Sequence, residues 1–180
     1  MTQEQIKAAL ERAANTITLR PAVGQRVYVN TAVVEDGLTC RVQEKHHGMT
    51  ADLPPSMGGA DAGPSPSALL RAALSSCVAM GVKMWAARRD VAIDRVEVRV
   101  ETDVDARGQF GVAEEIPAGF EDIRMHIHVK SPAEEEVIRD IVETSLRFSP
   151  LMDALCKAQT IHTDVSLAPA ALAQPALERQ

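Results

Sequence analysis

At 180 residues the chain is long enough to bury a core, and its formal net charge of −6 at pH 7 excludes a basic surface for nucleic acid or anionic membrane. Only 3% of the residues are aromatic, so the core must be built from aliphatic side chains and methionine. The N-terminal segment has no uninterrupted apolar signal region, and no other span reaches about 18 residues free of charge. We therefore expect a soluble, cytoplasmic protein that needs no cofactor.

The three cysteines, an odd number, fit neither a disulfide framework nor a clustered zinc site. In a reducing compartment we expect all of them to be free thiols. Cys40 alternates with apolar neighbours in a predicted strand and is interpreted as a small buried apolar residue.

The first 50 residues predict a helix followed by antiparallel strands. Residues 1–15 form an amphipathic helix, interpreted as an extension packed on a main domain of residues 16–167. From Thr16 to Gly48 apolar and polar residues alternate, which is typical of strands, with turns at 21–24 and 36–37. The inward residues of these strands are Ile17, Leu19, Val27, Val29, Val33, Leu38, Cys40 and Val42. His46 and His47 fall in the next turn, where a solvated pair is favoured over a metal site.

Residues 58–89 are the stretch around which the rest of the chain is organised. A loop rich in glycine and proline leads to Ser65 and Pro66, a serine cap followed by proline at the first helical position. The helix that follows is apolar on nearly all sides, and it carries only Arg71 and Lys83 as charges between residues 67 and 87. Such a helix belongs in the middle of a structure, so we expect Cys77 in or beside the core.

Two strands follow this helix. Residues 95–101 alternate between apolar and charged side chains, residues 105–119 form a loop or wide hairpin, and residues 124–130 alternate again. His126 and His128 point outward from the second strand as a two-histidine metal site would require. No third ligand is placed beside them, so no metal site is predicted.

The last third predicts two helices, a strand and a tail. Ser131 and Pro132 start one helix, with Glu134 completing a capping box, and Ser149 with Pro150 start a shorter one. Residues 160–167 alternate like a closing strand, and residues 168–180 form a loosely held tail. Strand hairpins separated by helices, without a βαβ rhythm, indicate an α+β fold.

Three segments carry a resemblance to a known family: GGADAGPSPSALLRAALSSCVAM, then RFSPLMDAL, then TIHTDVSL. Over Thr16 to Leu167 the chain resembles the OsmC/Ohr family of osmotically inducible and organic hydroperoxide resistance proteins, as a divergent OsmC-like member. The resemblance implies an intertwined homodimer, in which curved antiparallel sheets wrap two central helices. It also implies thiol peroxidase chemistry.

The resemblance assigns roles to particular residues. Cys77 matches the peroxidatic cysteine, which attacks the outer peroxide oxygen and becomes a sulfenic acid. The arginine that holds its thiolate comes from the early strands, where Arg20 and Arg26 are both candidates. The carboxylate that fixes this arginine is missing, because Pro66 is followed by serine instead of glutamate.

The resolving cysteine of the family is also missing, because its Cys-Pro pair is Ser149-Pro150 in this chain. Cys156 lies about 10 Å further along the helix. The Cα atoms of bridged cysteines lie within about 7 Å of each other, so Cys156 replaces the resolving thiol only if the helix sits differently.

Three interpretations follow. In the first, Cys77 reduces organic hydroperoxides and is regenerated by an external thiol. In the second, the chain is a non-catalytic dimer that binds a small hydrophobic ligand or acts by interaction. In the third, Cys77 is only a core residue.

Overall fold

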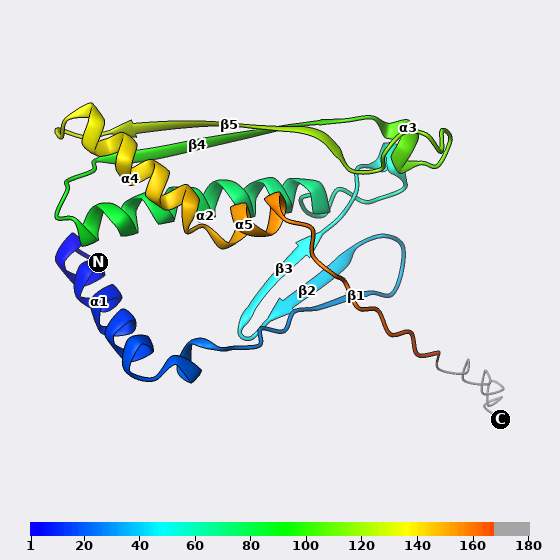
Figure 1. The fold of residues 1–180 in the computed structure, drawn as a ribbon. Helices are drawn as coiled ribbons and strands as arrows, with labels where there is room; N and C mark the ends of the chain where they lie inside the picture. Colours follow the sequence, from blue (N-terminus) through cyan, green and yellow to red (C-terminus); the bar gives the residue numbers. More distant parts are fainter. Residues whose placement is uncertain (168–180) are drawn as a thin grey trace, which may run out of the picture.

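The computed structural model describes residues 1–167 as a mixed α and β structure with two antiparallel sheets (Figure 1). In chain order the elements are α1 (Gln3–Leu19), η1 (Pro21–Gly24), β1 (Thr31–Val34), β2 (Cys40–Glu44), β3 (His47–Ala51), η2 (Pro55–Met57), α2 (Pro66–Arg88), β4 (Arg95–Val104), α3 (Ala106–Gln109), β5 (Phe120–Lys130), α4 (Glu135–Arg147) and α5 (Pro150–Cys156). This arrangement agrees with the predicted α+β class.

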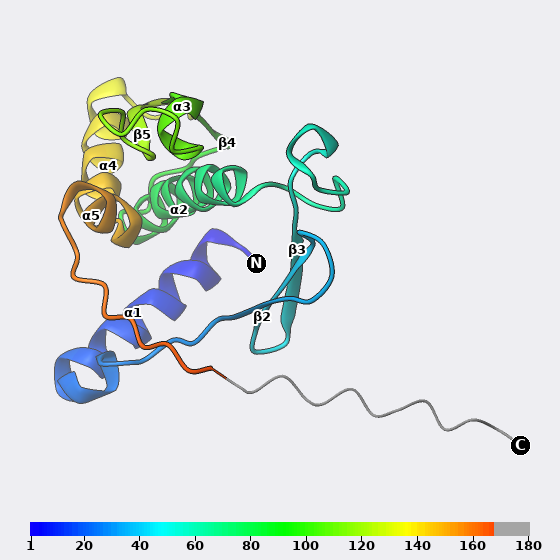
Figure 2. The same ribbon diagram turned by 90° about the vertical axis from the view of Figure 1, so that its right-hand side faces the viewer.

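Helix α2 contacts β4, α1, α4 and α5, and the end-on view of Figure 2 shows these elements grouped around it. It begins as predicted, because the Ser65 hydroxyl accepts a hydrogen bond from the Ala68 N–H at 3.3 Å and Pro66 occupies the first position. The side of α2 formed by Val78 and Val82 is completely buried. It packs with Ile141 of α4, so the core of the chain lies between these two helices and β4.

Strands β4 and β5 form a long two-stranded ribbon along α2 (Figure 1). Arg95 pairs with Lys130 at one end and Val104 with Phe120 at the other. Val96 and Val129 turn toward α2 and pack on the core, as the alternating pattern predicted.

The sheet of β1, β2 and β3 stands apart from this core (Figures 1 and 2). Its order follows the sequence, and both hairpins are antiparallel. The turn predicted at residues 36–37 is present, with Gly37 at a φ of +66°. Large side chains of β1, among them Val33 and Val34, are exposed in the single chain.

Two predictions near the N-terminus are wrong. Ile17 and Leu19 lie in the last turn of α1 instead of a strand, and the helix runs beyond residue 15. The hydroxyls of Thr16 and Thr18 donate to the carbonyls four residues earlier, so these polar groups are satisfied within the helix. Val27 and Val29 precede β1 and belong to no strand, and both are exposed.

Two predictions in the last third are also wrong. Ser131 and Glu134 do not form a capping box: α4 begins at Glu135 without a side-chain cap, and the Ser131 hydroxyl donates to the Ala92 carbonyl instead. Residues 160–167 are exposed and form no strand, because a strand needs a hydrogen-bonded neighbour and the described part of this chain offers none. The tail predicted at 168–180 lies outside the described residues.

Candidate functional site

Cys77 opens onto an apolar groove of about 480 Å³ between α2, the end of α4 and the start of α5. The side chain is half-buried, on the face of α2 that also carries Met80 and Met84. Most of the groove wall is aliphatic and aromatic. Apart from Cys77, its polar side chains are the hydroxyl groups of serines. Its lining includes Met80, Met84, Trp85, Phe148, Pro150 and Leu151.

Ser149 is the polar residue of this groove that contacts the Cys77 sulfur. Its hydroxyl oxygen lies 3.4 Å from the Cys77 sulfur, within the range of a sulfur hydrogen bond. The residue is only 5% exposed and caps α5, where it accepts a hydrogen bond from the Met152 N–H at 3.3 Å. The predicted start of the short helix is therefore correct. The distance between Ser149 and Cys77 could not be predicted from the sequence, because the two residues are 72 positions apart.

Close packing of α4 on α2 sets this distance. A Cβ atom on Gly81 would lie 2.4 Å from the Ser145 hydroxyl oxygen, closer than two such atoms can approach. Ser145 is buried and donates a long hydrogen bond of 3.5 Å to the Val78 carbonyl. Gly81 lies one turn after Cys77 on α2. Ser149 follows the end of α4, four residues after Ser145, and its N–H donates to the Leu146 carbonyl at 3.2 Å, so the contact between Gly81 and Ser145 also brings Ser149 close to Cys77.

The sequence pattern that defines the OsmC-like protein family matches residues 58–164, a segment that includes α2, both strands of the ribbon, α4 and α5. This chain belongs to the OsmC-like family. None of the curated protein sequences matches it.

Solved structures of OsmC-like proteins share the fold. An OsmC-like protein from Mycoplasma pneumoniae superposes with a TM-score of 0.63 at 20% identity, covering 73% of this chain and 89% of that one. An organic hydroperoxide resistance protein from Legionella pneumophila gives a TM-score of 0.54 at 15% identity, with 72% and 89% covered. A protein of the same description from Elizabethkingia anophelis gives 0.53 at 18% identity, with 72% and 88% covered. At these identities the likeness establishes the fold alone.

Within the described part of this OsmC-like chain, no arginine donates a hydrogen bond to Cys77 or lines its groove. Arg20 follows the end of α1 and is exposed, and Arg26 is exposed and donates to the Val23 carbonyl. Arg71, which precedes Cys77 on α2, donates to the Thr102 hydroxyl on β4 instead. The single chain thus leaves the predicted choice between Arg20 and Arg26 open.

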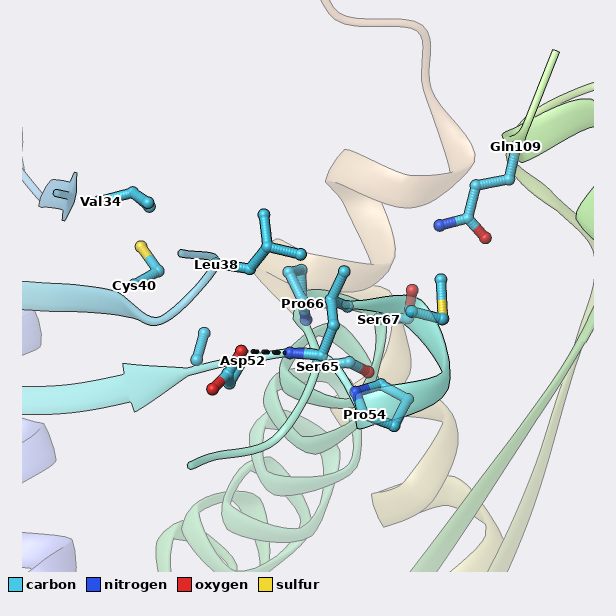
Figure 3. Close-up of a pocket in the computed structure, with 12 residues that line it drawn as sticks. Val34, Leu38, Cys40, Asp52, Pro54, Ser65, Pro66, Ser67 and Gln109 are labelled. Carbon is cyan, nitrogen blue, oxygen red and sulfur yellow. Dashed lines mark hydrogen bonds between the residues drawn. The ribbon is translucent and has the colours of Figure 1, made fainter. Parts of the chain in front are cut away.

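The other two cysteines lie away from the groove. Cys156 ends α5 and is exposed. Cys40 is half-buried in β2 and lines a second cavity of about 610 Å³ beside the start of α2 (Figure 3). This cavity is also lined by Ser67, the residue that follows Pro66 at the start of α2.

Asp52, beside this second cavity, is a buried carboxylate that the sequence analysis missed. It is 2% exposed and accepts hydrogen bonds from the Thr39 hydroxyl and from the N–H groups of Leu53, Ala60 and Ala62. Burial acts to raise the pKa of Asp52, but these hydrogen bonds outweigh it and hold the pKa below its ordinary value of 3.8. The carboxylate therefore holds the glycine-rich loop in place before α2.

The loop packs so closely on the end of β3 and the residues after it that two of its positions require glycine. A Cβ atom on Gly59 would lie 1.9 Å from the Leu53 carbonyl oxygen, and one on Gly63 would lie 2.3 Å from the Thr50 carbonyl oxygen. Only glycine fits where two backbones approach so closely. The loop itself was predicted, and an aspartate directly after a strand and before a glycine-rich segment is the signal that could have pointed to Asp52.

The histidines considered as metal ligands remain separate from the groove. His126 and His128 are exposed on β5, and the rings of His46 and His47 lie 4.0 Å apart at the start of β3. Among residues 1–167 no group of three or more possible ligands could hold a metal ion.

Helix α2 is long and apolar enough to cross a membrane, by length and composition only. Core helices of soluble proteins share these properties. Because α2 packs against β4, α1 and α4, we interpret it as the core helix of a soluble fold. A cytoplasmic location stays a prediction.

Proposed function

We propose that this protein is a thiol-dependent peroxidase that reduces organic hydroperoxides through Cys77, with an external thiol as the reductant. The observation that carries the proposal is the placement of a half-buried thiol at an apolar groove with a hydroxyl 3.4 Å from its sulfur. Family membership supports it, because some proteins with this fold are described as organic hydroperoxide resistance proteins.

In the first step the Cys77 thiolate attacks the outer oxygen of the hydroperoxide. The S–O bond forms as the O–O bond breaks, and the alkoxide leaves with a proton as an alcohol. Cys77 is then a sulfenic acid, oxidised by two electrons, and the hydroperoxide has been reduced by the same two.

The second half of the cycle needs a thiol from outside the chain. Ser149 cannot form a disulfide with Cys77, and Cys156 does not line the groove. An external thiol attacks the sulfenic sulfur and releases water, which leaves a mixed disulfide on Cys77. A second external thiol breaks that disulfide and restores the Cys77 thiol. One hydroperoxide and two thiols thus yield one alcohol, one disulfide and one water.

We further propose that the working unit is a homodimer. Met80 is 60% exposed and Met84 is 41% exposed, on the same face of α2 as Cys77. An apolar face of this kind on a soluble protein marks a contact surface, and a second copy of α2 matches it in chemistry. The arginine of the family mechanism would then reach the sulfur from either chain, through Arg20 or Arg26.

The apolar lining supports organic hydroperoxides over hydrogen peroxide as substrates. An alkyl chain that leaves water for the groove contributes about 25 cal/mol for each Å² of apolar surface buried. Hydrogen peroxide has no such surface, so Cys77 should react faster with an alkyl hydroperoxide. Equal rates with both oxidants would contradict this preference.

Cysteine variants test the proposed activity. With a small dithiol as reductant, Cys77→Ser should abolish the consumption of organic hydroperoxide. Cys40→Ser and Cys156→Ser serve as matched controls and should retain it. If the protein consumes no hydroperoxide with any thiol supplied, or if Cys77→Ser remains active, the peroxidase proposal is wrong.

A second candidate is a dimer without catalysis that binds a small hydrophobic molecule. It is favoured by the groove itself, since no charged side chain of the described residues lines it. On this account a hydrophobic ligand raises the melting temperature by mass action, and no reductant supports turnover. Hydroperoxide consumption that depends on Cys77 would exclude it.

A further inference from the structure

The Ser149 hydroxyl proton has one available hydrogen-bond acceptor among residues 1–167. The oxygen already accepts the Met152 N–H, and the sulfur of Cys77 is the other hydrogen-bonding atom in contact with it. With Ser149 only 5% exposed, little room is left for water to take the proton. A buried hydroxyl proton without an acceptor is costly, so it points to the sulfur.

We infer that Ser149 is a positioning residue, which donates a hydrogen bond to the Cys77 sulfur and thereby favours the thiolate over the thiol. A thiolate has no proton, so in that state only Ser149 can be the donor. Hydrogen bonds to an ionised acceptor are about twice as strong as neutral ones. The contact therefore stabilises the reactive form more than the resting form. This inference rests on the proposed function and gives Ser149 a part in it.

No charged side chain of the described residues lines the groove, and the nearby guanidinium groups of Arg88 and Arg147 lie over the rings of Trp85 and Phe148, at 4.7 and 5.2 Å from the ring centroids. Around Cys77 the groove is lined by residues of α2, the end of α4 and the start of α5, and none of those other residues is titratable. The loss of the Ser149 donor should therefore be seen directly in the reactivity of Cys77. The serine at this position thus retains contact with the sulfur, although it cannot close a disulfide.

The test is the rate at which iodoacetamide alkylates Cys77 between pH 6 and pH 10. It uses the full chain carrying Cys40→Ser and Cys156→Ser, so that Cys77 is the only thiol. Loss of a charge-assisted hydrogen bond should reduce the thiolate fraction at pH 7 roughly tenfold. The less stabilised thiolate is also about threefold more nucleophilic, because nucleophilicity follows basicity with a slope near 0.4–0.5. With Ser149→Ala the rate should therefore fall about threefold at pH 7 and rise about threefold at high pH.

Two further variants separate the donor from the helix cap. Ser149→Thr keeps both the hydroxyl and the cap, and should reproduce the parent profile. Ser149→Asp keeps a capping oxygen but has no proton to donate and adds a negative charge, so its rate at pH 7 should lie below that of Ser149→Ala. If Ser149→Ala does not fold, Ser149→Gly removes the hydroxyl without adding a charge, costs the helix cap little, and supplies the same comparison.

Crossing rate profiles for the parent and Ser149→Ala support the inference. Superimposed profiles overturn it, and so does an aspartate variant as reactive as the parent at pH 7. Alkylation involves no peroxide, which keeps the two proposals distinguishable. Crossing profiles without hydroperoxide consumption refute only the proposed function, and consumption with superimposed profiles refutes only the role of Ser149.

Discussion

Replacing Gly81 with alanine tests the contact that positions Ser149 against Cys77. The new Cβ atom would lie 2.4 Å from the Ser145 hydroxyl oxygen and 3.6 Å from the Ser145 Cβ atom. Forcing an atom into a closed contact costs about 2–3 kcal/mol, while alanine returns about 1 kcal/mol of helix propensity. We expect the free energy of unfolding to fall by about 1–2 kcal/mol for Gly81→Ala.

The double variant Gly81→Ala with Ser145→Ala should recover this loss. Removing the hydroxyl leaves the two Cβ atoms at an ordinary separation of 3.6 Å and gives up only one long hydrogen bond. Its free energy of unfolding should therefore lie within about 0.5 kcal/mol of the parent protein. The assay is urea unfolding of the parent, Gly81→Ala, Ser145→Ala and the double variant at one protein concentration, so that any association affects them equally. The packing argument fails if Gly81→Ala is as stable as the parent, or if the double variant is no more stable than Gly81→Ala.

Three other predictions concern the loop, the carboxylate and the apolar face. Gly59→Ala places a Cβ atom 1.9 Å from a backbone carbonyl and should cost more than about 3 kcal/mol, whereas Gly119→Ala meets open space and should leave the melting temperature unchanged. Because the pKa of Asp52 is lowered on folding, its contribution to stability is present above pH 3.8 and is lost as the pH falls through its folded pKa. Acid titration of unfolding should thus show the parent and Asp52→Asn differing at neutral pH and converging below about pH 3.8, and a gap independent of pH would contradict the assignment. Met80→Asp puts a charge on the exposed face of α2 and should give a monomer by light scattering, whereas an unchanged dimer would place the interface elsewhere.

The elements set by local chemistry were predictable from the sequence. Ser65 with Pro66 and Ser149 with Pro150 each begin a helix where predicted, because capping involves only neighbouring residues. The alternation of residues 95–101 likewise predicted which face of β4 packs on the core. The predicted family membership was confirmed by the match over residues 58–164.

The errors arose where the local pattern is ambiguous, where a strand has no partner, or where residues distant in the sequence come together. Ile17 and Leu19 fit a strand pattern as well as a helix pattern, and the helix that continues from Thr2 includes them. Residues 160–167 alternate like a strand but have no described neighbour to pair with. Asp52 was missed because its four donors come from separate points along the chain, and only the fold brings them together.

The most direct test of the central claim is the second-order rate of Cys77 oxidation by an alkyl hydroperoxide at neutral pH, with a reagent specific for sulfenic acid trapping the product. The account predicts rapid oxidation of the folded protein, with the trapped adduct on Cys77 and none on Cys40 or Cys156. A Cys77 thiol that stays unreactive until the protein is unfolded would show that this cysteine is only part of the core.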